Sequence, residues 1–235
     1  MDYAALARSL VDSLALRHAP VAVSFVERAP DGVPRVAGGA PASCGYWPRA
    51  AAGEVFHTVA DDHQRCPIGA HTHGVPLAPA AADELGQLIE QMVALAYLGA
   101  DEVAQIPTRK QPFAVAVYAP LDRAPVAPDV VVVRGGARSI MLLVEAARAA
   151  GVDGGELMGR PACAMLPRAI DSARGQASLG CVGNRVYTAL ADDEMYYALP
   201  GPHLAPVVEK LSTIAAANQA LFQLHTDRAH RFSMG

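Results

Sequence analysis

The chain has 235 residues, of which 52% are hydrophobic and 18% charged, and its 19 basic and 23 acidic side chains give a net charge of −4. This composition is typical of a folded globular domain, and the scattered Lys and Arg residues argue against nucleic acid as a partner. No apolar run approaches the roughly 20 residues of a membrane-spanning helix, so we expect no membrane association.

The opening sequence MDYAALARSL lacks the basic start and uninterrupted apolar core of a secretory signal, and we therefore expect a cytoplasmic location. We found no repeat, low-complexity tail or convincing linker. The Pro-rich turn at 122–129 is the weakest candidate boundary, so we predict a single domain over residues 1–235.

Hydrophobic periodicity predicts the elements of the first half. Leu6, Leu10 and Leu14 recur on one helical face, which indicates an opening amphipathic helix, and residues 20–27 read as a strand. Residues 38–75 are rich in Gly, Ala and His without a sustained period, which favours a loop-rich ligand segment with one helical turn near 50–52. A strong helix is predicted over 80–99, with Leu85, Leu88, Met92 and Leu95 on its apolar face and Gly99 at its end.

The second half predicts two strands at 113–121 and 129–135, a helix at 139–151, and a short helix at 161–175 that Pro167 would kink or break. Short strands at 176–181 and 194–201 flank a loop, and a final helix covers about 205–225. Several strand neighbours are joined by turns too short for a crossover helix. The pattern therefore predicts an α+β fold, a single domain with a mixed or largely antiparallel sheet packed against several helices.

The four cysteines are too few for a disulfide scaffold and have no C-x-x-C spacing; they are Cys44, Cys66, Cys163 and Cys181. In ASCGYW, RCPIGA and LGCVGN, a glycine lies close to the thiol, and Cys66 precedes proline, a context that suits ligands of a cluster. The alternative is four small buried hydrophobic residues, which the frame PACAML around Cys163 favours. Together, four thiols are what a [4Fe-4S] cluster or an all-thiolate zinc site requires.

The blocks SCGYWPRAAAGEVFHTVADDHQRCPIGAHTHG, PLDRAPVAPDVVVVRG, RPACAMLPRAI and SLGCVGNRVYTALADDEMYYALPG resemble the DUF169 family, also called the uncharacterised ArCR family. The resemblance covers about residues 14–228. It implies a conserved cysteine set, matched here by the four cysteines, and a suspected iron–sulfur role without an established substrate. Were one of the four positions to vary, a cluster with three thiolates and an open iron would be implied instead.

Residues beside the cysteines are candidates for tuning such a site. His63 lies three positions before Cys66 and is the best candidate for a hydrogen bond to cluster sulfur, while Trp47 could shield the site or pack in the core. Asn184 and Arg185 follow Cys181 and could polarise a cluster or bind an anion, or they could serve as a turn residue and a surface cation.

Three functions follow as hypotheses. The leading one is an iron–sulfur protein that binds one [4Fe-4S] cluster through Cys44, Cys66, Cys163 and Cys181, acting in electron transfer or as a redox enzyme on an unknown small molecule. The alternative is a structural zinc (Zn) site with a binding or regulatory role, and the third is a metal-free domain that binds a small ligand. A redox partner or a homodimer is left open. The sequence lacks a complete GxGxxG, a Walker A motif, HExxH and GxSxG, so nucleotide-binding, zincin and hydrolase hypotheses have no support.

Overall fold

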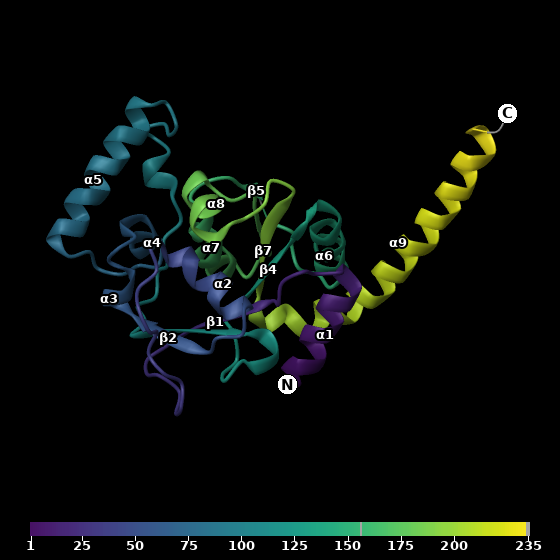
Figure 1. Ribbon diagram of the computed structural model, residues 1–235, viewed down its shortest axis with the longest axis horizontal. Helices are drawn as coiled ribbons and strands as arrows, with labels where there is room; N and C mark the ends of the chain where they lie inside the picture. The colour runs from purple at the N-terminus through teal and green to yellow at the C-terminus, as the bar shows by residue number, and fades with distance from the viewer. Residues whose placement is uncertain (156, 234–235) are drawn as a thin grey trace.

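The computed structural model describes residues 1–155 and 157–233 (Figure 1). The strands are β1 (Val21–Val26), β2 (Phe56–Val59), β3 (Val115–Pro120), β4 (Val130–Gly136), β5 (Leu157–Met158), β6 (Gln176–Ser178) and β7 (Glu194–Pro200). The α-helices are α1 (Tyr3–Leu14), α2 (Tyr46–Ala51), α3 (Ala60–His63), α4 (Pro67–Thr72), α5 (Pro79–Ala94), α6 (Ala137–Ala149), α7 (Met165–Ser172), α8 (Val182–Thr188) and α9 (Leu204–Ser233). Short 3₁₀ helices include η1 (Ser43–Gly45) and η4 (Ala162–Ala164).

All seven strands form one sheet in the order β2-β3-β1-β4-β7-β6-β5. Every neighbouring pair is antiparallel except β5 with β6, which is parallel. Valine runs such as Val130 to Val133 supply the β-branched side chains that fit a pleated surface covered on both faces. The predicted α+β class with a mixed sheet is therefore confirmed.

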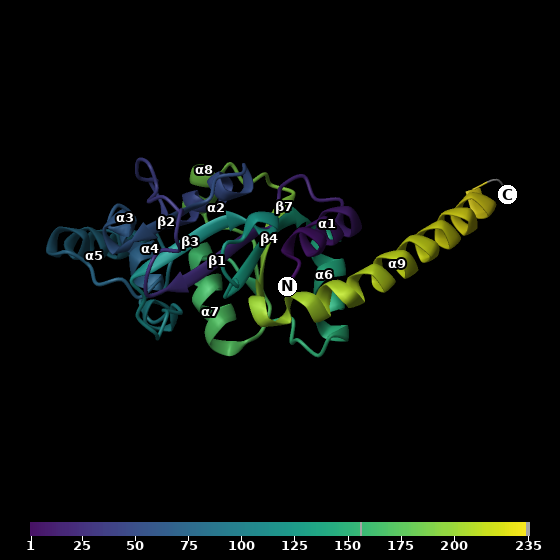
Figure 2. The same ribbon diagram turned by 90° about the horizontal axis from the view of Figure 1, so that it is seen from below.

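Helices cover both faces of the sheet (Figure 2). Because successive strand residues point to opposite faces, Val130 and Val132 join one core cluster, with α2 and α7, while Val131 and Val133 join the other, with α1, α6 and the first turns of α9. The two clusters are separate hydrophobic cores on the two sides of one sheet. The candidate site lies on the α2 and α7 side.

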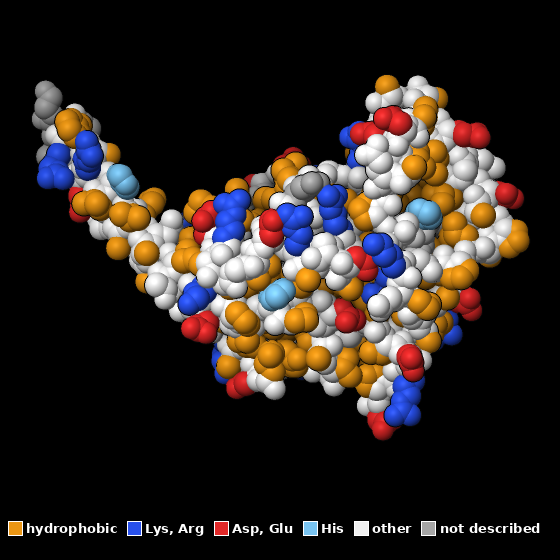
Figure 3. All heavy atoms as spheres, turned by 180° about the vertical axis from the view of Figure 1, so that it is seen from behind, with side chains coloured by type: hydrophobic (Ala, Val, Ile, Leu, Met, Phe, Trp, Pro, Cys, Tyr) orange, Lys and Arg blue, Asp and Glu red, His pale blue; other side chains and the backbone are white. Residues whose placement is uncertain are grey.

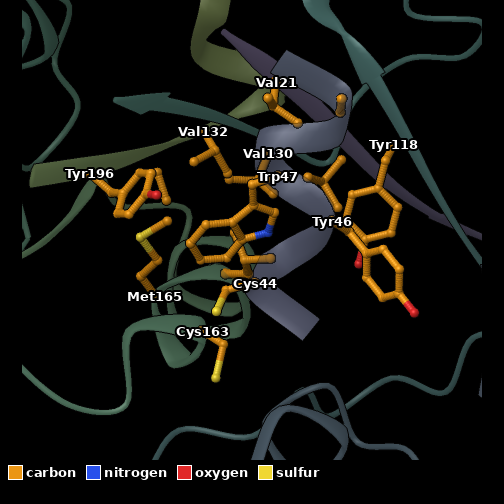
Figure 4. Packing of buried hydrophobic residues seen from close by; sticks show 14 of the residues in the cluster. Val21, Cys44, Tyr46, Trp47, Tyr118, Val130, Val132, Cys163, Met165 and Tyr196 are labelled. Carbon is orange, nitrogen blue, oxygen red and sulfur yellow. The ribbon is translucent and has the colours of Figure 1, made fainter. Parts of the chain in front are cut away.

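Trp47 occupies the centre of the first core (Figure 4). The indole is 1% exposed and meets the ring of Tyr196 edge-on, with centroids 5.1 Å apart and an interplanar angle of 75°. Val130, Val132 and Met165 surround it, and the thiols of Cys44 and Cys163 lie on the same side of the cluster (Figure 4). Of the two roles predicted for Trp47, packing in the core is the one that its surroundings support.

Several predicted boundaries are wrong, and each error has a local cause. Residues 38–75 contain four regular elements besides the short η1, because α2, α3 and α4 span only four to six residues and are too short to show a helical period. Pro167 does not break α7, since it lies in the first turn, where proline removes no internal hydrogen bond. The loop predicted after Cys181 holds α8, and the final helix runs on to Ser233.

Two helices extend away from the body. The distal half of α9 projects beyond α1 and α6 and exposes Leu221, Phe222 and Phe232 (Figure 1). At the other end α5 stands off the sheet, and of its 16 residues, all described, Ala81 is the one that is buried. The predicted apolar face of α5 therefore meets something other than the sheet.

Candidate functional site

A cavity of about 760 Å³ lies between α5 and the segments that carry the four cysteines. This volume falls within the range of small-molecule sites, roughly 300–1,000 Å³. Figure 3 shows hydrophobic side chains bordering the hollow beside the arm that α5 forms. The cavity walls come from η1, α4, α5, η4 and α8, which are far apart in the sequence.

The apolar wall of the cavity comes mainly from α5. Leu85, Leu88, Ile89 and Met92 recur at helical spacing and all line the cavity. The periodicity that predicted this helix was correct about which side chains share a face. It does not determine what the face contacts, because a cavity and a protein core both accept an apolar stripe.

Cys66 and Cys181 occupy equivalent places at the starts of two short helices. Each is the N-cap residue, and its sulfur accepts the backbone N–H three residues later, from Gly69 at 3.3 Å and from Asn184 at 3.5 Å. Pro67 follows as the first residue of α4, a position that suits proline. The Cys-Pro step that favoured a cluster ligand therefore marks a helix start. Both thiols are half-buried at the cavity wall.

Cys44 and Cys163 line the same cavity but are buried. Burial raises the pKa of Cys44 to about 12, and the Asn184 side chain opposes this with a smaller lowering effect. Burial, together with the charges that the neighbouring thiols Cys44 and Cys66 would carry, raises the pKa of Cys163 well above its ordinary value, although Thr72 donates a hydrogen bond to its sulfur at 3.3 Å. Both residues are thus protonated thiols at neutral pH.

The metal hypotheses are corrected by this arrangement. All four cysteines line one cavity, yet within residues 1–155 and 157–233 no group of three or more Cys, His, Asp or Glu side chains is arranged to hold a metal ion. The predicted [4Fe-4S] cluster on Cys44, Cys66, Cys163 and Cys181 is therefore wrong, and so is the alternative zinc site. The electron-transfer and redox roles that depended on the cluster lose their basis.

Asn184 is the polar side chain that stands out in the cavity wall. It is 1% exposed, and neither Oδ1 nor Nδ2 has a hydrogen-bond partner in the part of the chain that the structure describes. The carboxamide lies close enough to Cys44 to influence its pKa, but no well-aligned hydrogen bond joins the two. A buried polar group without a hydrogen-bond partner costs roughly 1–3 kcal/mol of stability.

The other predicted neighbours of the cysteines have structural roles. His63 is buried beside Ser43 and Thr58, with Oγ to ring nitrogen distances of 3.0 and 2.9 Å. The Arg185 guanidinium donates to the backbone carbonyls of Leu179 and Ala191 and lies near Asp192, which closes the turn before β7. The surface cation predicted as the alternative for Arg185 matches this position.

Sequence reasoning missed the contribution of α5 to the site. Leu85, Leu88, Met92 and Leu95 were predicted only as the apolar face of a helix, and all four line the cavity. One signal could have shown this: the helix is flanked by loops on both sides and has no predicted strand adjacent to it in the chain.

Comparisons with known proteins identify a family for this chain but no individual matching protein. In residues 1–155 and 157–233, no helix combines the length and apolar character needed to cross a membrane. No curated protein and no solved structure matches the chain. The model of the DUF169 family, described as uncharacterised ArCR, matches residues 9–210, which include every strand and all four cysteines, and the chain therefore belongs to this family.

Proposed function

We propose that the protein binds a small, largely apolar organic molecule in the cavity beneath α5. The observation that carries the proposal is that the apolar stripe of α5 faces a cavity of about 760 Å³ instead of a packed core. A stripe of leucine and methionine side chains left beside open space forgoes the stabilisation that burial would provide, about 25 cal/mol per Å² of apolar surface. A bound molecule would supply that burial.

The composition of the wall supports the same conclusion. Small-molecule sites are apolar with a few convergent polar groups. Here the wall is mostly apolar, with aliphatic side chains from α5 and from Ile68 and Ile106. Its polar side chains include four thiols and Asn184, and the side chains that can carry a charge near neutral pH are Arg65, His71, Glu84 and Arg160.

The guanidinium of Arg160 is paired with Glu102 at 3.3 Å and lies over the ring of Tyr97. The charge of Arg160 is already balanced, and the other two charged side chains of the wall, Arg65 and Glu84, have opposite signs. The wall therefore carries no excess charge, which favours a neutral ligand.

A neutral fluorescent dye, N-phenyl-1-naphthylamine, tests this proposal. We expect the dye to bind with a blue-shifted, enhanced emission, and Leu88→Asp to weaken its binding at least about tenfold, or about 1.4 kcal/mol. The matched control is Gln91→Asp, which introduces the same charge on the exposed side of the same helix. Circular dichroism of both variants checks that α5 remains helical.

The proposal fails if the wild-type protein does not bind the dye, or if the two aspartate variants bind it equally. Equal binding would place the dye on another apolar surface, such as the exposed side chains of α9.

A cytoplasmic location is part of the proposal. All four cysteines are free thiols in the described chain, which supports a reducing compartment.

A further inference from the structure

The projecting half of α9 carries an apolar surface that the body of the protein does not cover. Of residues 219–232, all but the half-buried Thr226 are exposed, and Figure 3 shows hydrophobic side chains along this arm. Leu221, Phe222 and Phe232 are 54%, 61% and 77% exposed. We infer that this half of α9 pairs with the same segment of a second copy of the chain, as two antiparallel helices. The inference is independent of the cavity beneath α5.

The exposed side chains continue the stripe by which α9 packs on the body. Leu211 is buried in the core that α9 shares with α1 and α6, and the partly buried Ile214 packs against that core. Leu221 follows Ile214 by seven residues and precedes Phe232 by eleven, close to two and three helical turns, so the three side chains lie on one face. The body covers this face at Leu211 and leaves it open from Leu221 onward.

The helix itself indicates a partner. Most helical stability in proteins comes from the packing of an amphipathic face, and a helical segment without such packing is only marginally stable in water. Yet α9 continues to Ser233, well past Asn218, whose Oδ1 accepts a hydrogen bond from Arg138 of α6 at 3.3 Å. A second helix along the open face would supply the missing packing.

A second copy fits this face in one orientation. In a parallel pair, the partner helix would run along the same face toward Leu211 and meet α1 and α6, which already cover it. In an antiparallel pair only the projecting halves overlap, and the two bodies lie at opposite ends. A two-fold axis then closes the assembly at a dimer, and Leu221 of each copy opposes the partner's Phe232.

The exposed surface is enough for a weak dimer. A phenylalanine side chain buries roughly 150–250 Å², so Phe222 and Phe232 at their present exposure offer on the order of 250 Å² per copy. With Leu221 and the flanking side chains, two copies bury on the order of 1,000 Å², the lower limit for a specific interface. We therefore expect a reversible dimer with a dissociation constant of about 10 µM.

Sedimentation velocity from about 1 to 100 µM tests the pairing, and the mass of the wild-type protein should rise from that of the monomer toward twice that value. Leu221→Asp should raise the dissociation constant at least about tenfold, because it brings a charge into the apolar contact. The matched control is Ala220→Asp, which lies about 100–200° around the helix from Leu221, Phe222 and Phe232 and should dimerise like the wild type. Circular dichroism of both variants checks that α9 remains helical.

A mixture of two variants tests the orientation. Leu221→Lys and Phe232→Asp should each dimerise more weakly than the wild type. When they are mixed, an antiparallel pair places the introduced lysine opposite the introduced aspartate in one contact and keeps leucine against phenylalanine in the other. We therefore expect the mixture to dimerise more strongly than either variant alone. A parallel pair would align neither contact, and absence of this rescue would contradict the antiparallel arrangement.

Three results would overturn the second copy as the occupant of this face. One is a wild-type protein that stays monomeric throughout the concentration range. Another is equal dimerisation of Leu221→Asp and Ala220→Asp, which would place the interface on a different surface. The third is a monomer that binds phosphatidylglycerol vesicles and loses this binding in Leu221→Asp, which would assign the face to a lipid surface. None of these results bears on the binding of the dye in the cavity.

Discussion

The centroids of the imidazole rings of His63 and His73 lie 5.3 Å apart, and both side chains are buried. His63 is held by the Ser43 and Thr58 hydroxyls, and His73 donates from Nδ1 to the Gly69 carbonyl at 2.6 Å. Since Thr58 donates its hydroxyl proton to the Ala116 carbonyl, His63 donates from Nε2 and accepts from Ser43 at Nδ1. Both rings are therefore neutral in the folded protein.

The two histidines should make the protein sensitive to acid. Burial, with a further lowering from the neighbouring His73, brings the pKa of His63 to about 3. Burial brings the pKa of His73 to about 4, because the lowering by burial outweighs the raising effect of the hydrogen bond to Gly69. Below about pH 6.5 the unfolded histidines take up protons while the folded ones stay neutral. The free energy of unfolding should thus fall by up to about 1.4 kcal/mol per pH unit for each histidine.

Urea unfolding at several pH values between 7 and 4.5 measures the slope of the free energy of unfolding against pH. His73→Gln should reduce the slope by about half of the histidine contribution, whereas His225→Gln, on the exposed surface of α9, should not change it. A slope identical in wild type and His73→Gln would show that His73 titrates normally in the folded state.

The ion pair between Arg134 and Glu194 should contribute strongly to stability. Glu194 is 3% exposed and accepts hydrogen bonds from Arg134 Nε at 2.8 Å and from Arg17 at 3.0 Å. Burial alone would raise the pKa of Glu194, but the Arg134 hydrogen bond and the nearby positive charges hold it below its ordinary value. Arg134→Met leaves a buried carboxylate short of its main partner and should destabilise the protein by about 3 kcal/mol.

The control for this pair is Arg148→Met, which breaks the exposed pair of Arg148 with Glu145 on α6 and should cost less than about 0.5 kcal/mol. Chemical denaturation at pH 7 measures the loss of stability in both variants. Because the pKa of Glu194 is lowered, the contribution of the pair is present above about pH 4.5 and is lost as the pH falls further. Equal effects of the two substitutions at pH 7 would contradict the buried role of Glu194.

Gly201, directly after β7, should not tolerate a side chain. A Cβ there would collide with the backbone carbonyl of Pro128, and the Gly201 N–H donates to the Asp129 carbonyl at 2.8 Å. Gly201→Ala must displace backbone and should cost about 2 kcal/mol or more, as overpacking in tight structure does. Gly86→Ala in α5, where nothing lies within 4 Å of the added carbon, should stabilise by up to about 1 kcal/mol. Thermal unfolding of the two variants should shift in opposite directions.

The four thiols should react at two distinct rates. Alkylation needs the thiolate, and Cys44 and Cys163 are buried with raised pKa values. We expect N-ethylmaleimide to label the half-buried Cys66 and Cys181 first, and Cys44 and Cys163 only when the protein unfolds. Peptide mass spectrometry over a time course resolves the four sites, and uniform labelling would contradict the arrangement of the cavity wall.

Saturating N-phenyl-1-naphthylamine should slow the labelling of Cys66 and Cys181 if the dye occupies the cavity, since both residues line it. An unchanged labelling rate in the presence of bound dye would place the dye elsewhere.

Local patterns in the sequence determined much of the fold. The continuous apolar runs of β1, β3 and β4 and the 3.6-residue period of α1 and α6 arise within single elements, so the chain alone predicts them. The α+β class, the mixed sheet and the family resemblance were confirmed on this basis. The single domain over 1–235, the homodimer and the absence of a nucleic-acid partner stay predictions.

Only the tertiary structure decided the site. Glycine and proline beside the cysteines suggested ligands of a cluster, but Cys66 and Cys181 are the N-cap residues of short helices, and Cys44 and Cys163 are buried in the wall of a cavity. A spacing along the chain does not determine how sulfurs are oriented about a point, because that depends on contacts between segments about a hundred residues apart. For the same reason the apolar stripe of α5 was visible in the sequence, while the space in front of it was not.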